Sequence, residues 1–120
     1  MNVNVKFEKY ILRRWKQGED WPPERSSGGT YALDYENKQV GAVFGSSINR
    51  IFMIQTNPKG KGHGTRFLQM LMEEARRQGR KEFRVDGVTG HTSEDEEVMK
   101  YILTKLGFQQ IDEDTWIKNL

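Results

Sequence analysis

The segment Lys59–Thr65 carries the residues whose types and spacing have the clearest chemical meaning. It reads Lys-Gly-Lys-Gly-His-Gly-Thr and lies between a β-rich run that ends at Thr56 and an amphipathic helix pattern. Glycine lacks a Cβ atom, so three glycines allow a sharp turn and let a ligand approach the backbone closely. The first N–H groups of a helix have no intrahelical acceptor, and the helix dipole places partial positive charge there. The segment therefore predicts an anion site suited to phosphate, to which Lys59 and Lys61 add positive charge.

Two common phosphate-binding loops do not match this segment. A Walker A loop needs Gly-x-x-x-x-Gly-Lys-Ser/Thr, and Thr65 or Phe67 stands where its second glycine would be. A Rossmann loop needs Gly-x-Gly-x-x-Gly, and the same two residues take the place of its third glycine. A glycine-rich turn from strand to helix, with two solvated lysines, stands as the alternative interpretation.

The elements that position this segment are predicted from hydrophobic periodicity. Apolar residues recur with helical spacing after the segment, so we expect a helix from near Thr65 to Gly79. A second helix with the same spacing ends at Gly107, and Ser93 with Glu96 suits a capping box at its start. Runs rich in apolar and β-branched residues predict strands, namely Val3–Phe7, Thr30–Tyr35, Gln39–Phe44, Ile48–Thr56, Glu82–Val88, Phe108–Ile111 and Thr115–Ile117.

Three segments of the first half carry more specific predictions. A short polar gap separates Thr30–Tyr35 from Gln39–Phe44, which favours an antiparallel hairpin. The centre of Ile48–Thr56 is nearly all apolar, which is typical of a strand covered on both faces. The residues before the hairpin are expected to hold one short helix over Glu8–Gln17 and then a loop over Trp21–Gly29, where two prolines and two glycines prevent regular structure.

The order of the predicted elements defines a fold class. It runs strand, helix, loop, three strands, helix, strand, helix and two strands. Hairpins mixed with strand–helix units predict an α+β (mixed α/β) fold, in which helices cover a central sheet. The 120 residues suffice for one domain and show no internal repeat or linker, so residues 1–120 are expected to form a single domain.

Composition narrows the classes of function. The chain has no cysteine, which excludes disulfides, thiolate metal sites and an enzyme-bound thioester. The formal net charge of +2 is too small to imply nucleic acid by itself. No apolar run approaches the roughly 20 residues of a membrane span, and the first residues lack the pattern of a secretory signal. A cytoplasmic location is therefore expected.

Two motifs resemble those of the GCN5-related N-acetyltransferases, the GNAT superfamily. The acetyl-CoA loop of that family reads Arg/Gln-x-x-Gly-x-Gly/Ala between a strand and a helix, and Lys59–Gly64 resembles it with lysine in the first place. A later helix of the family ends in Tyr-x-Lys-x-Gly-Phe, and Leu103–Phe108 resembles this motif as Leu-Thr-Lys-Leu-Gly-Phe. The matching region spans Ile48–Phe108. The resemblance implies a central, mostly antiparallel twisted sheet flanked by helices, with a shortened N-terminal helical region.

The resemblance also implies a cosubstrate and a reaction. Acetyl-CoA is expected to bind with its diphosphate on the amides of the glycine loop and its pantetheine arm along the preceding strand, without a metal. The implied binding residues are Ile54, Gln55, Thr56, Lys59, Gly60, Lys61, Gly62, His63, Gly64 and Thr65. The implied activity is direct transfer of the acetyl group to a primary amine. A catalytically silent acyl-CoA-binding module is the alternative, and the balanced charge argues against a nucleic-acid-binding domain.

The sequence assigns no catalytic residue. Leu103 stands where the family often has a tyrosine that protonates the leaving thiolate, and Tyr101 is expected on another side of the helix, as a surface or packing residue. His63 is expected to have an exposed ring or to contact phosphate. The candidates for a general base, each expected to be structural or solvated instead, are Asp34, Asp86 and His91.

The N-terminal region bears on the acceptor. The family usually has two helices between its first two strands, and these cover the acceptor site. This sequence offers one predicted helix and the Trp21–Gly29 loop. Such a short cover leaves an open site, so we expect the acceptor to be a lysine side chain or the N-terminal amine of a polypeptide. A homodimer partner that fills the gap is the alternative.

Overall fold

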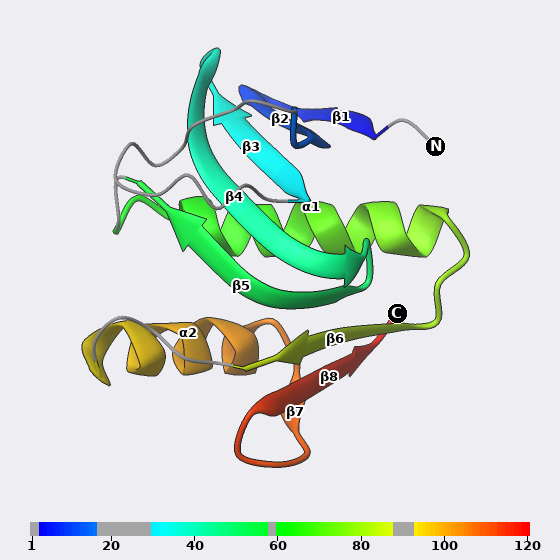
Figure 1. The fold of residues 1–120 in the computed structure, drawn as a ribbon, viewed down its shortest axis with the longest axis vertical. Coiled ribbons are helices and arrows are strands. Elements are labelled where there is room, and N and C mark those ends of the chain that lie inside the picture. Colours follow the sequence, from blue (N-terminus) through cyan, green and yellow to red (C-terminus); the bar gives the residue numbers. More distant parts are fainter. Residues whose placement is uncertain (1–2, 17–29, 58–59, 88–92) are drawn as a thin grey trace.

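The computed structural model describes residues 3–16, 30–57, 60–87 and 93–120. These residues form β1 (Asn4–Phe7), β2 (Tyr10–Arg14), β3 (Tyr31–Tyr35), β4 (Lys38–Ser47), β5 (Arg50–Thr56), α1 (His63–Arg77), β6 (Glu82–Asp86), α2 (Ser93–Lys105), β7 (Gln109–Gln110) and β8 (Thr115–Asn119). The strands make one sheet in the order β1-β2-β3-β4-β5-β6-β8-β7 (Figure 1). Neighbouring strands are antiparallel except β5 and β6, which are parallel. The predicted α+β fold with a mostly antiparallel sheet is therefore confirmed.

The predicted helix over Glu8–Gln17 is wrong, because the chain forms a second strand there. Glu8 has a φ of 54°, in the left-handed region, and the turn at this point brings Tyr10 opposite Phe7. β2 then pairs with β3 along its whole length. Tyr10 and Leu12 are both buried, so a strand with alternating faces forms where the apolar spacing also suits a helix.

Two earlier expectations fall outside the described part of the chain. The predicted loop Trp21–Gly29 lies there, and so do the side-chain contacts of the capping box at Ser93. Within residues 3–16, 30–57 and 60–62, no helix precedes α1.

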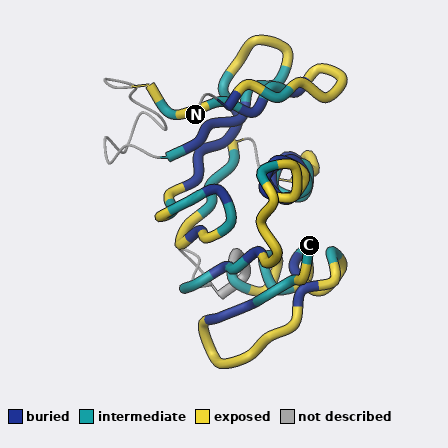
Figure 2. Tube along the Cα trace, turned by 90° about the vertical axis from the view of Figure 1, so that its right-hand side faces the viewer, coloured by how far each residue is buried: buried dark blue, intermediate teal, exposed yellow. Residues whose placement is uncertain are grey.

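Helix α1 covers the central strands and supplies much of the core. It begins at His63, two residues before the predicted start, and ends at Arg77. Gly79 follows with a φ of 83°, a conformation that glycine adopts without strain after a helix. Figure 2 shows the buried residues along the central strands and on the side of α1 turned toward them. The largest fully buried side chains are Phe67, Phe83, Leu12, Leu33, Ile48, Ile51, Leu68, Leu71, Leu103 and Val43.

Strand β5 differs from the predicted strand covered on both faces. Ile51 is fully buried, whereas Phe52 and Met53 are 37% and 49% exposed. The pairing with β4 joins Phe44 to Met53 and then Gly45 to Ile51, which leaves Phe52 as one extra residue of β5. Such a bulge interrupts the regular alternation of faces. The apolar run therefore does not correspond to two covered faces.

The two predicted hairpins are confirmed. β3 and β4 pair antiparallel across a turn in which Glu36 and Asn37 have positive φ. β7 and β8 pair antiparallel at the end of the chain, although β7 covers only Gln109–Gln110. Polar turn residues between apolar runs are a local signal, so both hairpins could be found without knowledge of the tertiary structure.

We expect Gly41→Ala to lower the free energy of unfolding by about 1–3 kcal/mol, as overpacking of a core does. A Cβ atom at Gly41 of β4 would lie 2.8 Å from Cδ2 of the fully buried Phe67 of α1. Gly64→Ala is the control, since its Cβ would meet nothing closer than 3.9 Å. Because alanine favours a helix more than glycine does, Gly64→Ala is expected to raise the free energy of unfolding by at most about 1 kcal/mol. Urea denaturation measures both changes, and a Gly41→Ala protein as stable as wild type would contradict the prediction.

Candidate functional site

The opening between β5 and β6 is the feature around which the candidate site is built. These two strands pair only at Arg50↔Arg84 and Ile51↔Val85. β5 then continues to Thr56, and Figure 1 shows the two strands moving apart toward that end. Among the described residues, no strand pairs with this edge of β5 beyond Ile51. The backbone of this part of β5 therefore has one edge available to another extended chain.

The start of α1 follows shortly after the end of β5 and leaves backbone donors free. Gly62 is the N-cap, with a φ of 80° and no side chain to cap the helix. The first helical bond runs from the N–H of Arg66 to the carbonyl of Gly62, at 3.1 Å. Within the described part of the chain, the N–H groups of His63, Gly64 and Thr65 have no acceptor, and the first turn has no acidic residue. This turn therefore presents free donors and partial positive charge.

The surroundings of Gly64 show that the start of α1 lies next to the open end of β5. A Cβ atom at this position would lie 4.0 Å from Cγ2 of Thr56 and 3.9 Å from Cδ1 of Ile102. The first turn of α1 thus lies between the end of β5 and the inner side of α2. The predicted residues Ile54–Thr56 and Gly60–Thr65 are brought together here, with Lys61 exposed, whereas Lys59 lies outside the described residues.

His63 differs from its prediction, because its ring is buried and not exposed. The residue is 6% exposed, and Nδ1 lies 2.9 Å from the hydroxyl of Tyr10 in β2. Its ring centroid lies 5.7 Å from that of Tyr10 and 5.3 Å from that of Tyr35. Burial, and after it the charge of Lys61, lowers the pKa of His63, so the ring is neutral at pH 7. The expected phosphate contact stays a prediction.

A second side chain of the first turn also reaches the N-terminal hairpin. The guanidinium carbon of Arg66 lies 4.3 Å from the ring centroid of Phe7 and 5.9 Å from that of Tyr10. Burial, followed by Tyr35, raises the pKa of Tyr10, although Arg66 acts in the opposite direction. Sequence reasoning missed Phe7 and Tyr10 because they are more than fifty positions away and because Tyr10 falls in a segment that the sequence predicts as helix.

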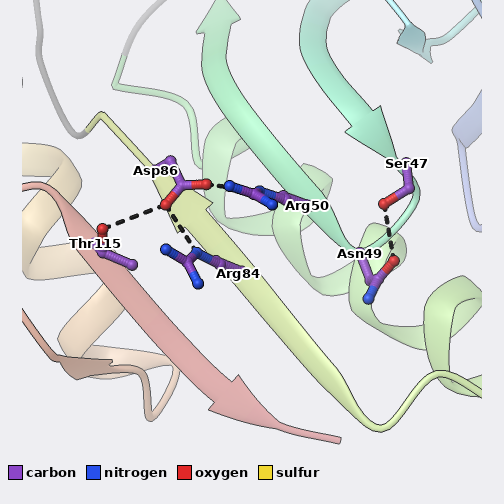
Figure 3. A network of polar contacts seen from close by, with 6 residues as sticks. All are labelled: Ser47, Asn49, Arg50, Arg84, Asp86 and Thr115. Carbon is purple, nitrogen blue, oxygen red and sulfur yellow. Dashed lines mark hydrogen bonds and ion pairs between the residues drawn. The ribbon is translucent and has the colours of Figure 1, made fainter.

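The two described carboxylates proposed as bases are engaged in ion pairs. Asp34 accepts two hydrogen bonds from Arg13, at 2.8 and 3.2 Å. Asp86 accepts from Nε of Arg50 and Nε of Arg84, both at 2.9 Å, and from Thr115 at 3.3 Å. Figure 3 shows both arginines and Thr115 pointing toward Asp86.

The charge of Asp86 is maintained against its burial. Burial raises the pKa of this carboxyl, but the hydrogen bonds from Arg84 and Arg50 outweigh that effect and hold the pKa below its usual value. A carboxylate in this state is a weak proton acceptor. The third candidate, His91, lies outside the described residues.

Asn49 adds a second set of bonds at the place where β5 and β6 meet. Its carbonyl accepts from the N–H of Arg84 at 2.8 Å, and its side-chain amide donates to the carbonyl of Glu82 at 3.0 Å. The hydroxyl of Ser47 donates to Oδ1 of Asn49 at 2.9 Å, as Figure 3 also shows. Together with Asp86, these bonds hold β6 against β5 beside the opening.

Helix α2 places Leu103 and Tyr101 on different sides, as the sequence predicts. Leu103 is fully buried in the core, where the family often has its tyrosine. Tyr101 is 68% exposed, which confirms that it lies on a different side of the helix. Among the described residues, no group of histidine and acidic side chains could hold a metal ion, and no helix is long and apolar enough to cross a membrane.

Comparisons with known proteins show similarity in structure. No protein-family model and no curated protein matches the sequence. A GNAT family acetyltransferase from Elizabethkingia anophelis, solved with acetyl-CoA bound, matches with a TM-score of 0.64 and 13% identity over 95% of this chain and 100% of that chain. RimL, a ribosomal L7/L12 alpha-N-protein acetyltransferase, matches with a TM-score of 0.63 and 13% identity over 100% of this chain and 96% of that chain. A polyamine N-acetyltransferase from Drosophila melanogaster matches with a TM-score of 0.55 and 11% identity over 75% of this chain and 74% of that chain.

These identities are low, so the similarity is one of fold.

We expect Asp86→Asn to lower the free energy of unfolding at pH 7 by about 1–3 kcal/mol, because two arginines lose a charged acceptor. The pKa of the Asp86 carboxyl is lower in the folded protein than the value of about 3.9 in the unfolded chain. Its ionised form therefore stabilises the fold above about pH 3.9, and this stabilisation is lost as the pH falls through the folded pKa. The difference between wild type and variant should therefore shrink below about pH 4.

Denaturation at several pH values measures this effect. Asp114→Asn is the control, since this exposed side chain in the turn between β7 and β8 makes no ion pair in the described structure. A stability difference for Asp86→Asn that is as large at pH 3 as at pH 7 would show that the charge of Asp86 is not what matters.

Proposed function

We propose that this chain, which has the fold of the GCN5-related N-acetyltransferases, binds acetyl-CoA and transfers the acetyl group to a primary amine. The observation that supports the proposal best is the opening of β5 from β6 next to a helix start with free N–H groups. An extended ligand with a diphosphate at one end fits these two features together. The whole of residues 1–120 is proposed to act as one domain of this kind.

The proposed binding mode divides the ligand between the loop and the strand edge. The diphosphate would accept hydrogen bonds from the amides of Gly60–Thr65, and Lys59 and Lys61 would add charge. The pantetheine arm contains amide groups, so it would pair with the backbone at Ile54–Thr56 much as an added strand does. Acetyl-CoA bound to the Elizabethkingia protein supports the choice of ligand.

The proposed chemistry needs two proton transfers. The neutral acceptor nitrogen attacks the thioester carbonyl carbon and the carbon–sulfur bond breaks. The nitrogen gives up one proton to become an amide, and CoA leaves as a thiolate that takes up one proton. The chain has no cysteine to form an acyl-cysteine intermediate, and the proposed transfer to the amine is direct. We assign no side chain to either proton transfer, since Asp34 and Asp86 accept from arginines and Leu103 has no proton to give.

We propose that the acceptor is an amine of a polypeptide. The described residues before α1 contain no helix that covers the site, which supports an open access for a chain. Without an assigned base, the intrinsic pKa of the acceptor matters, and it is about 7.7–8.0 for an α-amine and about 10.4 for lysine. This favours the N-terminal amine, because a larger fraction of it is unprotonated at pH 7.

A silent acyl-CoA-binding module is the second candidate. The buried leucine at position 103 favours it, because a hydrocarbon side chain replaces the usual proton donor. Both candidates require CoA binding, so they separate only on turnover.

We expect CoA to bind and Gly62→Leu to weaken its affinity by at least about tenfold, because the new side chain enters the space where the phosphate lies. Isothermal titration calorimetry measures the dissociation constants. Gly79→Leu is the matched control: Gly79 has a φ of 83° against 80° for Gly62, and neither has an atom within 4 Å of an added Cβ. The two variants carry the same backbone strain, so equal affinities would contradict the proposed site.

We expect acetyl-CoA to be consumed with a short peptide that has a free N-terminus and no lysine. A peptide with a blocked N-terminus and one lysine should react at least about tenfold more slowly at pH 7, in line with the two pKa values. Release of the CoA thiol measures the rate, with spermidine and agmatine as small-molecule acceptors. Turnover with these amines alone would refute the polypeptide acceptor, and no turnover despite CoA binding would favour the silent module.

A further inference from the structure

The hydrogen bond between Tyr10 and His63 can be drawn in two ways. In the first, the Tyr10 hydroxyl donates to Nδ1, and the ring proton of the neutral His63 is then on Nε2. In the second, Nδ1–H donates to the tyrosine oxygen, and Nε2 carries a lone pair. The two tautomers present opposite groups at the far end of the ring, a donor in one case and an acceptor in the other.

The need of the Tyr10 hydroxyl proton for an acceptor favours the first arrangement. The hydrogen bond is buried, and in the described structure the Tyr10 hydroxyl has no acceptor other than His63. If Nδ1–H donated instead, the hydroxyl proton would be buried without an acceptor, which is unfavourable. Nε2 of His63 has no partner among the described residues and is not fully enclosed, so a proton at that end can reach water or a ligand.

The surroundings keep this ring neutral and fixed. His63 contacts two tyrosine rings, and the cations near the pair are Lys61 and Arg66, while Glu8 acts on Tyr10 from the hairpin turn. A neutral imidazole binds an anion through whichever nitrogen carries the proton, and the Nε2 lone pair of the other tautomer would repel it. The position of one proton therefore decides whether His63 helps or hinders an anion at the start of α1.

We propose that Tyr10 is a positioning residue that holds His63 in the Nε2–H form, so that the ring donates a hydrogen bond to the phosphate bound by the first turn of α1. This inference rests on the proposed function. His63 is the first residue of that turn, and its backbone N–H is one of the free donors. The buried ring would thus extend the backbone site with one side-chain donor, whose tautomer is set by Tyr10 of β2.

The test compares Tyr10→Phe with Tyr35→Phe. Each variant removes one hydroxyl from the same group of three rings, in which Tyr10 and Tyr35 have centroids 4.6 Å apart. Only the first removes the hydrogen bond to His63, since the Tyr35 hydroxyl has no hydrogen bond in the described structure. The nitrogen chemical shifts of the His63 ring report its tautomer, and calorimetry with CoA reports the affinity.

We expect the wild type and Tyr35→Phe to show the proton on Nε2, and Tyr10→Phe to show a mixture of tautomers. Tyr10→Phe should weaken CoA binding by about tenfold, the effect of one hydrogen bond to a charged group, and Tyr35→Phe by less than about threefold. In a His63→Leu background, Tyr10→Phe should have no further effect on affinity, because the residue through which it acts is gone.

Several results would overturn the inference. These are a wild-type ring with the proton on Nδ1, an unchanged affinity in Tyr10→Phe, and an equal loss of affinity in the two tyrosine variants. A wild type that does not bind CoA refutes the proposed function itself and the phosphate contact with it. If the wild type binds CoA but the tautomer does not depend on Tyr10, only the inference fails.

Discussion

The short parallel contact between β5 and β6 is the constraint on which the rest of the structure depends. Parallel neighbours cannot be joined by a tight turn, so the chain must leave β5, cross over through α1 and return as β6. Two residue pairs are a weak connection between the halves of a sheet. Side chains strengthen it: Asn49 bonds to the backbone of β6, and Asp86 accepts from Arg50 of β5. The strands can therefore separate toward Thr56 without loss of the continuous sheet.

The helix start at the open end shows a related compromise. A serine or aspartate at the N-cap would occupy one of the free N–H groups with its side-chain oxygen. Gly62 leaves them unoccupied, and the first turn is held in another way. The ring of His63 is buried against Tyr10, and Arg66 lies over Phe7, so contacts with the N-terminal hairpin hold the turn in place. The donors stay available, and the backbone that carries them does not depend on the ligand for its position.

The sequence predicts what is local and misses what depends on distant pairing. The glycine loop and the amphipathic stripe of α1 could be found because each is a pattern within a few residues, and the start was wrong by only two positions. Residues 10–14 fit both a helix and a strand, and the pairing with β3, about twenty positions further on, decides between them. The burial of His63 follows from the same pairing, because it places Tyr10 beside the ring. Two partners of Asp86, Arg50 and Thr115, come from β5 and β8, which no spacing in the sequence brings beside β6.

The carboxylates near the proposed site form structural ion pairs, which limits their use as general bases in the proposed reaction. Asp86 lies on β6 at the edge of the opening, but a carboxylate that accepts from two arginines has little tendency to take a proton. Asp34 is paired in the same way with Arg13, and Leu103 adds only hydrocarbon. A site of this kind can still speed acyl transfer by holding the thioester and the amine close together, since orientation alone lowers a barrier by several kcal/mol. Among the described residues, neither Asp34 nor Asp86 is a strong base, so in the proposed reaction the acceptor's own pKa gains weight.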